Sequence, residues 1–523
     1  MREFIQNLKV HDLIRNYNDI VLRCIYLLHL FVSFNTYLNV TYLPKVSLIF
    51  LMLITVIAFG YQIINIKNFI SKKRFYLVIF FILSYAVSMC FYLNNNFYNN
   101  VKCIMWIIIL LFLIYLYFPH KEKVNIYKEI KILSILSVFY ITIVNIIGFI
   151  LMYFNISVFK TALDGSVQFY GFWWGRLYGL FNDPNHGAVI SVIGIFLAIG
   201  LYNKELCWKK KFLIVLSIFI QFFYITFSDS RTAIVSLICG CIVFLFFNFI
   251  LTYRLNFKNF TKFFLTIILC TTAILLLNKT IKLSYNYIIS SSSNNTDKDN
   301  SIVRNGINSI KITSSNFYEG KIENNSKIYM NNSVVNFKTS YGNNQKRNVL
   351  ILELNNEESN HLEIGREQDI SGDISNRRFS IWKSGIDLFA ESPLIGVGGY
   401  SNIVTFAQEN KPTTYLVAND YKIFDSFHNS FLDILVSQGF IGFSIFLLLM
   451  ILNIHFLFKN LKYLKEDSYI ISIFLSIISC VLVSSFFISN IMYVNSIESF
   501  YFWCFLGYLN YYITTNIKQE EKI

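Results

Sequence analysis

The chain has 523 residues, of which 55% are hydrophobic, 18% are aromatic and only 15% are charged. A soluble domain usually carries about a quarter charged residues, so this composition excludes an ordinary soluble protein and indicates a membrane protein. The formal net charge of +14 would suit a nucleic-acid-binding protein, but the positions of the basic residues argue against that class.

Apolar segments of transmembrane length recur along the chain. Since a helix needs roughly twenty apolar residues to cross the bilayer core, twelve spans are predicted, centred near residues 29, 55, 84, 109, 140, 195, 220, 242, 270, 447, 479 and 506. With the N-terminus inside, the short inner segments are rich in Lys and Arg, whereas the short outer segments carry only Lys160, Arg176 and Arg231. This bias follows the positive-inside rule. It predicts that both termini are cytoplasmic and that the long polar segment lies outside.

The predicted architecture is an all-α polytopic membrane protein with about 12 transmembrane helices and one large extracytoplasmic loop between spans 9 and 10. Residues 1–281 hold spans 1 to 9, residues 282–435 form the loop, and residues 436–523 hold spans 10 to 12. Within the loop, residues 290–365 are low in complexity and then alternate in polarity, which predicts a β-rich or flexible insertion. Residues 373–435 are predicted to be helical and to carry much of the chemistry.

The cysteines do not indicate a metal site or a disulfide framework. All nine are scattered through the spans or their inner edges, and no CxxC pair is present. The first span follows a charged stretch and lacks a small-residue cleavage site, so an uncleaved first helix is expected. Because the outer side shows no His, Cys and carboxylate cluster with metal-ligand spacing, no metal ion or other cofactor is expected.

Two arginines at the outer face run against the charge bias. Arg176 ends a longer outer segment, just before a helix start in which Asn182 or Asp183 is the cap and Pro184 occupies the first turn. Arg231 begins the eighth span. Either arginine can snorkel to lipid headgroups, but a charge at membrane depth usually faces a cavity and marks a site. The functional interpretation is favoured for the two together.

The last part of the polar loop contains the remaining candidates. Ser375 or Asp373 is expected to cap a helix whose apolar stripe (Phe379, Trp382, Ile386 and Phe389) is typical of packing. The following GVGG turn lacks the Lys-Ser/Thr and the strand of a phosphate loop, and a short helix is predicted near residues 403–409.

His428 or Asp425 is expected at the start of the tenth span. A lone histidine there more often has a capping or interface role. Nearby arginines, however, would lower its pKa and keep it able to accept a proton.

Together these motifs resemble the O-antigen ligase and polysaccharide polymerase superfamily of bacterial envelopes. The resemblance rests on R-x-x-G-x-F-x-x-P-N from Arg176 to Asn185, on Ser230-Arg231, and on N-R-R-x-x-x-W at 376–382. It continues with P-L-x-G-x-G at 393–398, H-N-x-x-L at 428–432 and Q-G-x-x-G at 438–442. The match covers roughly residues 165–445, and residues 290–365 go beyond the usual core.

The resemblance implies a GT-C-like, metal-independent inverting glycosyltransferase. Such an enzyme moves a polyprenyl-pyrophosphate-linked glycan to an acceptor at the outer face of the bacterial cytoplasmic membrane. By motif match, His428, Arg176 and Arg231 are the catalytic candidates, with His428 near the acceptor hydroxyl. Arg377, Arg378, Asn185 and Asn429 are the candidates for binding pyrophosphate or glycan. Arginine suits this role because its planar fork binds phosphate oxygens bidentately.

Within this class the alternatives stay open. A polymerase of capsule or exopolysaccharide repeats is preferred, because abundant Asn, Lys, Ile, Phe and Tyr indicate an AT-rich genome, common in bacteria without an outer membrane. A ligase to lipid A core and a protein O-oligosaccharyltransferase are the alternatives. A lipid-linked sugar flippase is the rival of another class, although internal repeats and broken mid-membrane helices, typical of transporters, are not evident.

Overall fold

The computed structural model describes most of the helical chain and short parts of the long polar segment. The described residues are 9–64, 73–92, 96–116, 123–161, 167–173, 175–205, 207–252, 257–296, 310–313, 327–330, 333–339, 349–354, 364, 375, 377–418 and 424–520.

Helices dominate this part of the chain. They are α2 (Lys9–Phe34), α3 (Thr36–Asn39), α4 (Leu43–Ile64), α6 (Lys73–Phe91), α7 (Phe97–Ile108) with its π-helical continuation (Ile109–Tyr115), α8 (Lys123–Tyr153), α9 (Pro184–Lys204), α10 (Trp208–Phe227), α11 (Arg231–Thr252), α12 (Phe257–Thr296), α14 (Arg378–Glu391), a 3-10 turn (Tyr400–Asn402), α15 (Ile403–Asn410), α16 (Ser430–Lys459), a second 3-10 segment (Leu461–Asp467), α17 (Ser468–Ser484) and α18 (Ile497–Glu520).

All twelve predicted span centres fall on helices, but the count of twelve spans is not confirmed. Among the described residues, ten helical segments are long and apolar enough to cross a membrane. The two remaining centres lie on α2, whose apolar part (Ile20–Phe34) is shorter, and on α18, which does not meet the criterion. The ninth predicted span, α12, continues to Thr296, past the expected start of the loop at residue 282.

The prediction of an all-α protein is wrong in detail, because two small antiparallel sheets are present. Strands β1 (Ser157–Thr161), β2 (Val167–Trp173) and β3 (Arg176–Gly179) form a meander in the order β1-β2-β3. Strands β4 (Ile310–Thr313), β5 (Lys327–Met330), β6 (Ser333–Thr339) and β7 (Val349–Leu354) form the second sheet, in the order β4-β7-β6-β5. The second sheet lies where the sequence predicts a β-rich insertion, whereas the first lies in a segment expected to have no strands.

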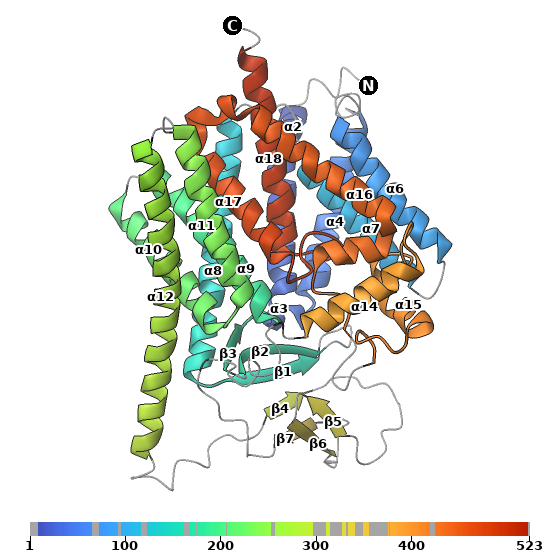
Figure 1. The fold of residues 1–523 in the computed structure, drawn as a ribbon, viewed down its shortest axis with the longest axis vertical. Helices are drawn as coiled ribbons and strands as arrows, with labels where there is room; N and C mark the ends of the chain where they lie inside the picture. The colour runs from blue at the N-terminus through green and yellow to red at the C-terminus, as the bar shows by residue number, and fades with distance from the viewer. Residues whose placement is uncertain are drawn as a thin grey trace.

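The long helices run between two different ends of the molecule (Figure 1). The start of α2 and the end of α18 lie at one end, and both sheets lie at the other, here called the sheet end. A single apolar core fills the bundle, with the bulky side chains of Trp503, Tyr501 and Phe196 fully buried. A second, smaller core under α14 and α15 includes Ile381 and Phe427.

The sheet end carries more basic side chains than the three that the sequence analysis assigns to the short outer segments. Lys45 and Lys102 lie near the starts of α4 and α7, and both helices begin at the sheet end. Each ammonium lies over a tyrosine ring of its own helix or turn, at 5.9 Å from the Tyr42 centroid and 4.4 Å from the Tyr98 centroid. The two lysines therefore weaken the charge asymmetry on which the predicted orientation rests.

Helix α16 is broken at Gly439, where the backbone has φ 65° and ψ −169°. The break is filled by the turn after α14. The N–H groups of Phe440 and Ile441 donate to the carbonyls of Pro393 and Leu394, at 2.7 and 3.2 Å. A Cβ at Gly439 would lie 2.4 Å from the Leu394 carbonyl oxygen, and one at Gly396 would lie 2.5 Å from the Gly439 nitrogen. The two glycines thus let two backbones interlock, and they hold the first part of α16 in place.

Candidate functional site

The junction of β3 and α9 forms the first wall of the candidate site. Asp183 is the N-cap of α9, with its Oδ1 accepting from the Asn185 N–H at 2.7 Å, and Pro184 occupies the first turn. The predicted helix start is confirmed. Since β3 begins at Arg176, a short strand and one turn bring that arginine next to the first turn of α9.

Arg176 and Asn185, both predicted site residues, are in direct contact. The Arg176 side chain is only 8% exposed. Its Nε donates to the Ser228 carbonyl at 2.8 Å, and its Nη2 donates to the Asn185 Oδ1 at 2.9 Å. The Ser230 hydroxyl donates to the same Asn185 oxygen at 3.1 Å. This contact joins the β3–α9 junction to the turn between α10 and α11.

Arg231 is the first residue of α11 and is exposed. The preceding residue, Ser230, contacts the first turn of this helix, because its Oγ accepts from the Ala233 N–H at 3.3 Å. Asp229 instead forms an ion pair with Lys282 of α12. Lys282 is therefore a second basic residue beside this turn. In the sequence it is only the first residue of the predicted loop, with no sign of this contact.

His428 lies in the turn before α16, in a left-handed conformation with φ 49°. The prediction that His428 lies at the start of the tenth span is confirmed, because α16 begins at Ser430. The cap is Asn429, whose Oδ1 accepts from the N–H groups of Phe431 and Leu432 at 3.1 and 3.2 Å. A short polar residue caps better than a ring at this position because its oxygen can reach back to the first turn. Asn429 therefore has a structural role, whatever else it contacts.

Asp433 and Ser430 hold the His428 turn against the segment between α17 and α18. The buried Asp433 accepts from the Phe427 N–H at 3.1 Å through Oδ1 and from the Ser489 hydroxyl at 2.5 Å through Oδ2. The Ser430 Oγ accepts from the Asn490 N–H at 2.9 Å. His428 is thus placed by a fixed turn and not by a loose loop.

The pKa of Asp183 links the β3–α9 junction to the turn that carries His428. Burial alone would raise the pKa of this carboxyl, but His186, the Asn185 N–H, Arg176 and His428 together hold the pKa of Asp183 below its ordinary value. Each of these groups must lie close enough to favour the carboxylate. His428 and Arg176, which are far apart in sequence, therefore both lie within electrostatic range of Asp183.

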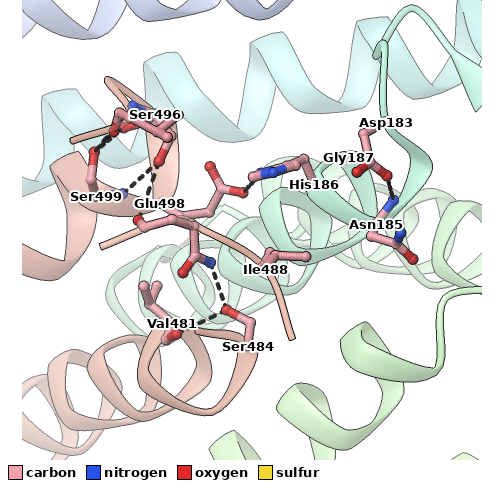
Figure 2. Close-up of polar contacts among 12 residues, drawn as sticks. Asp183, Asn185, His186, Gly187, Val481, Ser484, Ile488, Ser496, Glu498 and Ser499 are labelled. Atoms are coloured by element: carbon pink, nitrogen blue, oxygen red, sulfur yellow. Dashed lines mark hydrogen bonds and ion pairs between the residues drawn. The ribbon is translucent and has the colours of Figure 1, made fainter. Parts of the chain in front are cut away.

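A pair formed by a partly exposed histidine and a buried carboxylate completes this region, and the sequence does not predict it (Figure 2). His186 of α9 points at Glu498 of α18, with 2.7 Å between Nδ1 and Oε1. The Glu498 side chain is fully buried, and within the described residues its second oxygen has no hydrogen-bond partner. Burying a carboxylate inside a membrane span costs free energy, so Glu498 in the predicted twelfth span could have been recognised from the sequence as a candidate site residue. Its partner could not be read from the sequence.

The paired arginines stand at the start of α14. Arg377 is the residue before the helix, with φ 66°, and the predicted cap Ser375 lies two positions earlier, where its Oγ accepts from the Phe379 N–H at 3.5 Å. The Ser375 carbonyl accepts from the Arg378 N–H at 3.3 Å, and Asp373 lies outside the described residues. The Arg378 guanidinium lies 5.6 Å from the ring centroid of Phe487. Phe487 belongs to the segment between α17 and α18, to which Ser430 is hydrogen-bonded.

The structure thus brings some of the predicted residues together and leaves others on adjoining elements. Arg176 touches Asn185, and His428 lies within electrostatic reach of Asp183. Arg231, Arg377 and Arg378 begin α11 and α14 beside these walls. In the described part of the chain, no group of three or more His, Cys, Asp or Glu side chains could hold a metal ion.

A bundle of apolar helices with a polar cluster at one end defines a multi-pass membrane protein with a candidate site at the membrane boundary. Residues 216–447 match the family model described as O-antigen ligase. This match supports the resemblance that the motifs indicate to the O-antigen ligase and polysaccharide polymerase superfamily. The match includes Arg231 and His428, whereas Arg176, Asn185 and Glu498 lie outside it. A search of curated proteins found no match.

Proposed function

We propose that this protein transfers glycan units from a polyprenyl-pyrophosphate donor to an acceptor glycan at the sheet end of the bundle. The bundle would lie in the bacterial cytoplasmic membrane, with this end outside. The observation that carries the proposal is the contact of Arg176, Asn185 and Ser230, which joins two predicted motifs in a chain with an O-antigen ligase region.

The chemistry is a displacement at the anomeric carbon of the donor sugar. The acceptor hydroxyl oxygen forms the new glycosidic bond while the bond to the pyrophosphate oxygen breaks, which inverts the configuration. The pyrophosphate leaves on its lipid, and the hydroxyl proton passes to His428. Arginines suit the leaving group because a charge-assisted fork stabilises developing negative charge in a water-poor site. No metal ion or cofactor is needed in this scheme, since cationic side chains supply the charge.

The finer role that we propose is polymerase of surface polysaccharide repeat units. A ligase or protein oligosaccharyltransferase would use the same donor chemistry with another acceptor. A transporter is less well supported. The backbone groups freed by the break in α16 at Gly439 already have partners within the protein. The N–H groups of Phe440 and Ile441 donate to the turn after α14, and the carbonyls of Val436 and Ser437 accept from the N–H groups of Val397 and Gly399.

Removal of the gene from the producing bacterium, followed by sizing of its lipid-linked glycans, tests the proposal. A polymerase predicts that single repeat units accumulate on lipid and that long chains return with the wild-type gene. A ligase predicts instead that long lipid-linked chains accumulate without transfer. Retention of single units on the cytoplasmic face would identify a transporter and would overturn the proposal.

A further inference from the structure

Helix α14 runs across the sheet end of the bundle, not along the direction of α12 and α18 (Figure 1). One face is fixed to the protein. Ile381, Ser384, Gly385 and Leu388 are buried, and a Cβ at Gly385 would lie 2.6 Å from Leu432. The packing of this face sets the rotation of the helix.

The opposite face of α14 carries large apolar side chains that the described part of the chain leaves exposed. Phe379 is 67% exposed and Ile386 is 60% exposed. The sequence predicts that these two residues pack, and that prediction is wrong. Lys383 lies between them at helical spacing and is also exposed. An exposed apolar stripe on a fixed helix indicates an interaction surface.

This stripe continues into the outer surface of a spanning helix. Leu394 follows α14, is 63% exposed, and accepts through its carbonyl from the Ile441 N–H. Phe440 and Ile441 are 58% and 46% exposed, and the same helix, α16, goes on to expose Ile451 at 57%. Since α16 is a candidate span, its exposed apolar surface faces lipid. The turn after α14 is hydrogen-bonded to α16 at Phe440 and Ile441, so exposed apolar residues of the two helices come close together there.

We propose that α14 is an interfacial helix, with Phe379, Ile386 and Leu394 embedded in the lipid leaflet at the sheet end. The occupant of the stripe is the bilayer itself. Lys383 fits this environment, because a lysine stem can lie along apolar surface while its ammonium reaches anionic headgroups. The inference does not depend on the proposed enzyme activity, only on the chain spanning a membrane.

Embedding α14 would fix the depth of the candidate site. The Trp382 Nε1 of this helix donates to the Phe427 carbonyl at 3.1 Å, next to His428. A helix that lies in the membrane surface therefore keeps the His428 turn at the same level, where a lipid-linked donor presents its pyrophosphate.

Photocrosslinking in vesicles tests the placement of α14. A benzophenone amino acid replaces Phe379 or Ile386, and in a matched control it replaces Glu409, an exposed residue of α15. The full-length variants are reconstituted in phosphatidylethanolamine and phosphatidylglycerol, irradiated, and analysed by mass spectrometry. Size-exclusion profiles equal to that of the unsubstituted protein confirm folding.

The expected result is several-fold more lipid adducts at positions 379 and 386 than at position 409. Adducts to a second copy of the chain, or to another segment of the same chain, would show that protein covers the stripe and would overturn the proposal. Equal lipid labelling at all three positions would also overturn it. None of these outcomes depends on glycan transfer, so they are distinct from a failure of the proposed function.

Discussion

At the scale of single residues, the burial of Arg176 bears directly on its role. A snorkelling arginine would extend to headgroups and stay exposed, but Arg176 is 8% exposed and donates to Ser228 and Asn185. Snorkelling is therefore excluded for Arg176 in this conformation. Arg231 is exposed at the start of α11, and for that residue the choice between a headgroup contact and substrate binding is open to experiment.

His428 is predicted to act on the acceptor hydroxyl and not on donor binding. General-base help typically contributes about 10²–10⁴-fold in rate, so His428→Ala should lower turnover by that order while lipid-linked donor still binds. The measurement is single-turnover transfer together with donor affinity. His428→Gln can hydrogen-bond a hydroxyl without taking its proton. Recovery of most activity in the Gln variant would mean that His428 positions the acceptor, and loss of donor affinity in the Ala variant would assign it to the phosphate site.

The His186–Glu498 pair is predicted to stabilise the fold around the site. Loss of one partner of a buried ion pair typically costs roughly 3–5 kcal/mol, so Glu498→Ala should lower the thermal unfolding temperature markedly. Thermal unfolding in detergent is the measurement. Replacement of both partners by Gln should recover much of the loss, because no lone charge remains buried.

The exposed ion pair of Lys411 and Glu391, 2.7 Å apart, offers a matched control. Glu391→Gln should leave the unfolding temperature unchanged, since exposed pairs contribute little. Equal effects of the buried and exposed substitutions would contradict a stabilising role for Glu498.

The sequence predicts individual residues only where a rule of local chemistry or of charge bias applies. Arg176 and Arg231 can be recognised because they run against the charge bias. The Asp183 cap can be recognised because a short polar residue before proline is typical of a helix start. His186 gives no local signal, since its meaning depends on Glu498, which lies 312 positions away. The cap of α16 cannot be chosen from the sequence, because several polar residues stand close together before Phe431, and only the backbone shows that Asn429 is the cap.

At the scale of helices and strands, apolar periodicity located every long helix but not its exposed face. Helix α14 has apolar residues at two overlapping helical spacings, one through Ile381 and Leu388 and one through Phe379 and Ile386. Either set can be the buried one. Strands β1 to β3 escaped prediction because they are short and aromatic-rich beside the membrane, where Trp173 is equally typical of an interface anchor.

The interlock at Gly439 is predicted to be intolerant of any side chain. Gly439→Ala forces a left-handed backbone on a non-glycine residue, which costs roughly 1–2 kcal/mol, and also places Cβ against the Leu394 carbonyl. The yield and the unfolding temperature of the purified protein should both fall. Gly60→Ala is the matched control, because nothing lies within 4 Å of the added Cβ. A Gly439→Ala variant as stable as Gly60→Ala would contradict the interlock.

At the scale of the whole molecule, the open question is orientation across the membrane. The start of α2 and the end of α18 share one end of the bundle, and both sheets lie at the other. The basic inner segments predict that the first of these ends is cytoplasmic, although Lys45 and Lys102 reduce the contrast.

Cysteine labelling in intact cells with a membrane-impermeant maleimide measures the orientation. Glu409→Cys, on α15 at the sheet end, should be labelled, and Lys210→Cys, exposed at the start of α10, should be labelled only after lysis. The unsubstituted chain gives the background from its nine cysteines. The opposite pattern would invert the molecule and place the candidate site inside the cell.

The most direct test of the central claim is glycan transfer by the purified protein in vesicles, with a lipid-pyrophosphate-linked oligosaccharide as donor. We expect a ladder of longer lipid-linked glycans that forms in the presence of EDTA. We also expect rates lower by about 10²–10³-fold in Arg176→Ala and Arg231→Ala, the scale of losing a group that stabilises developing charge. A donor that is left unextended by the folded wild-type protein, or that crosses the membrane without forming a glycosidic bond, would contradict the account.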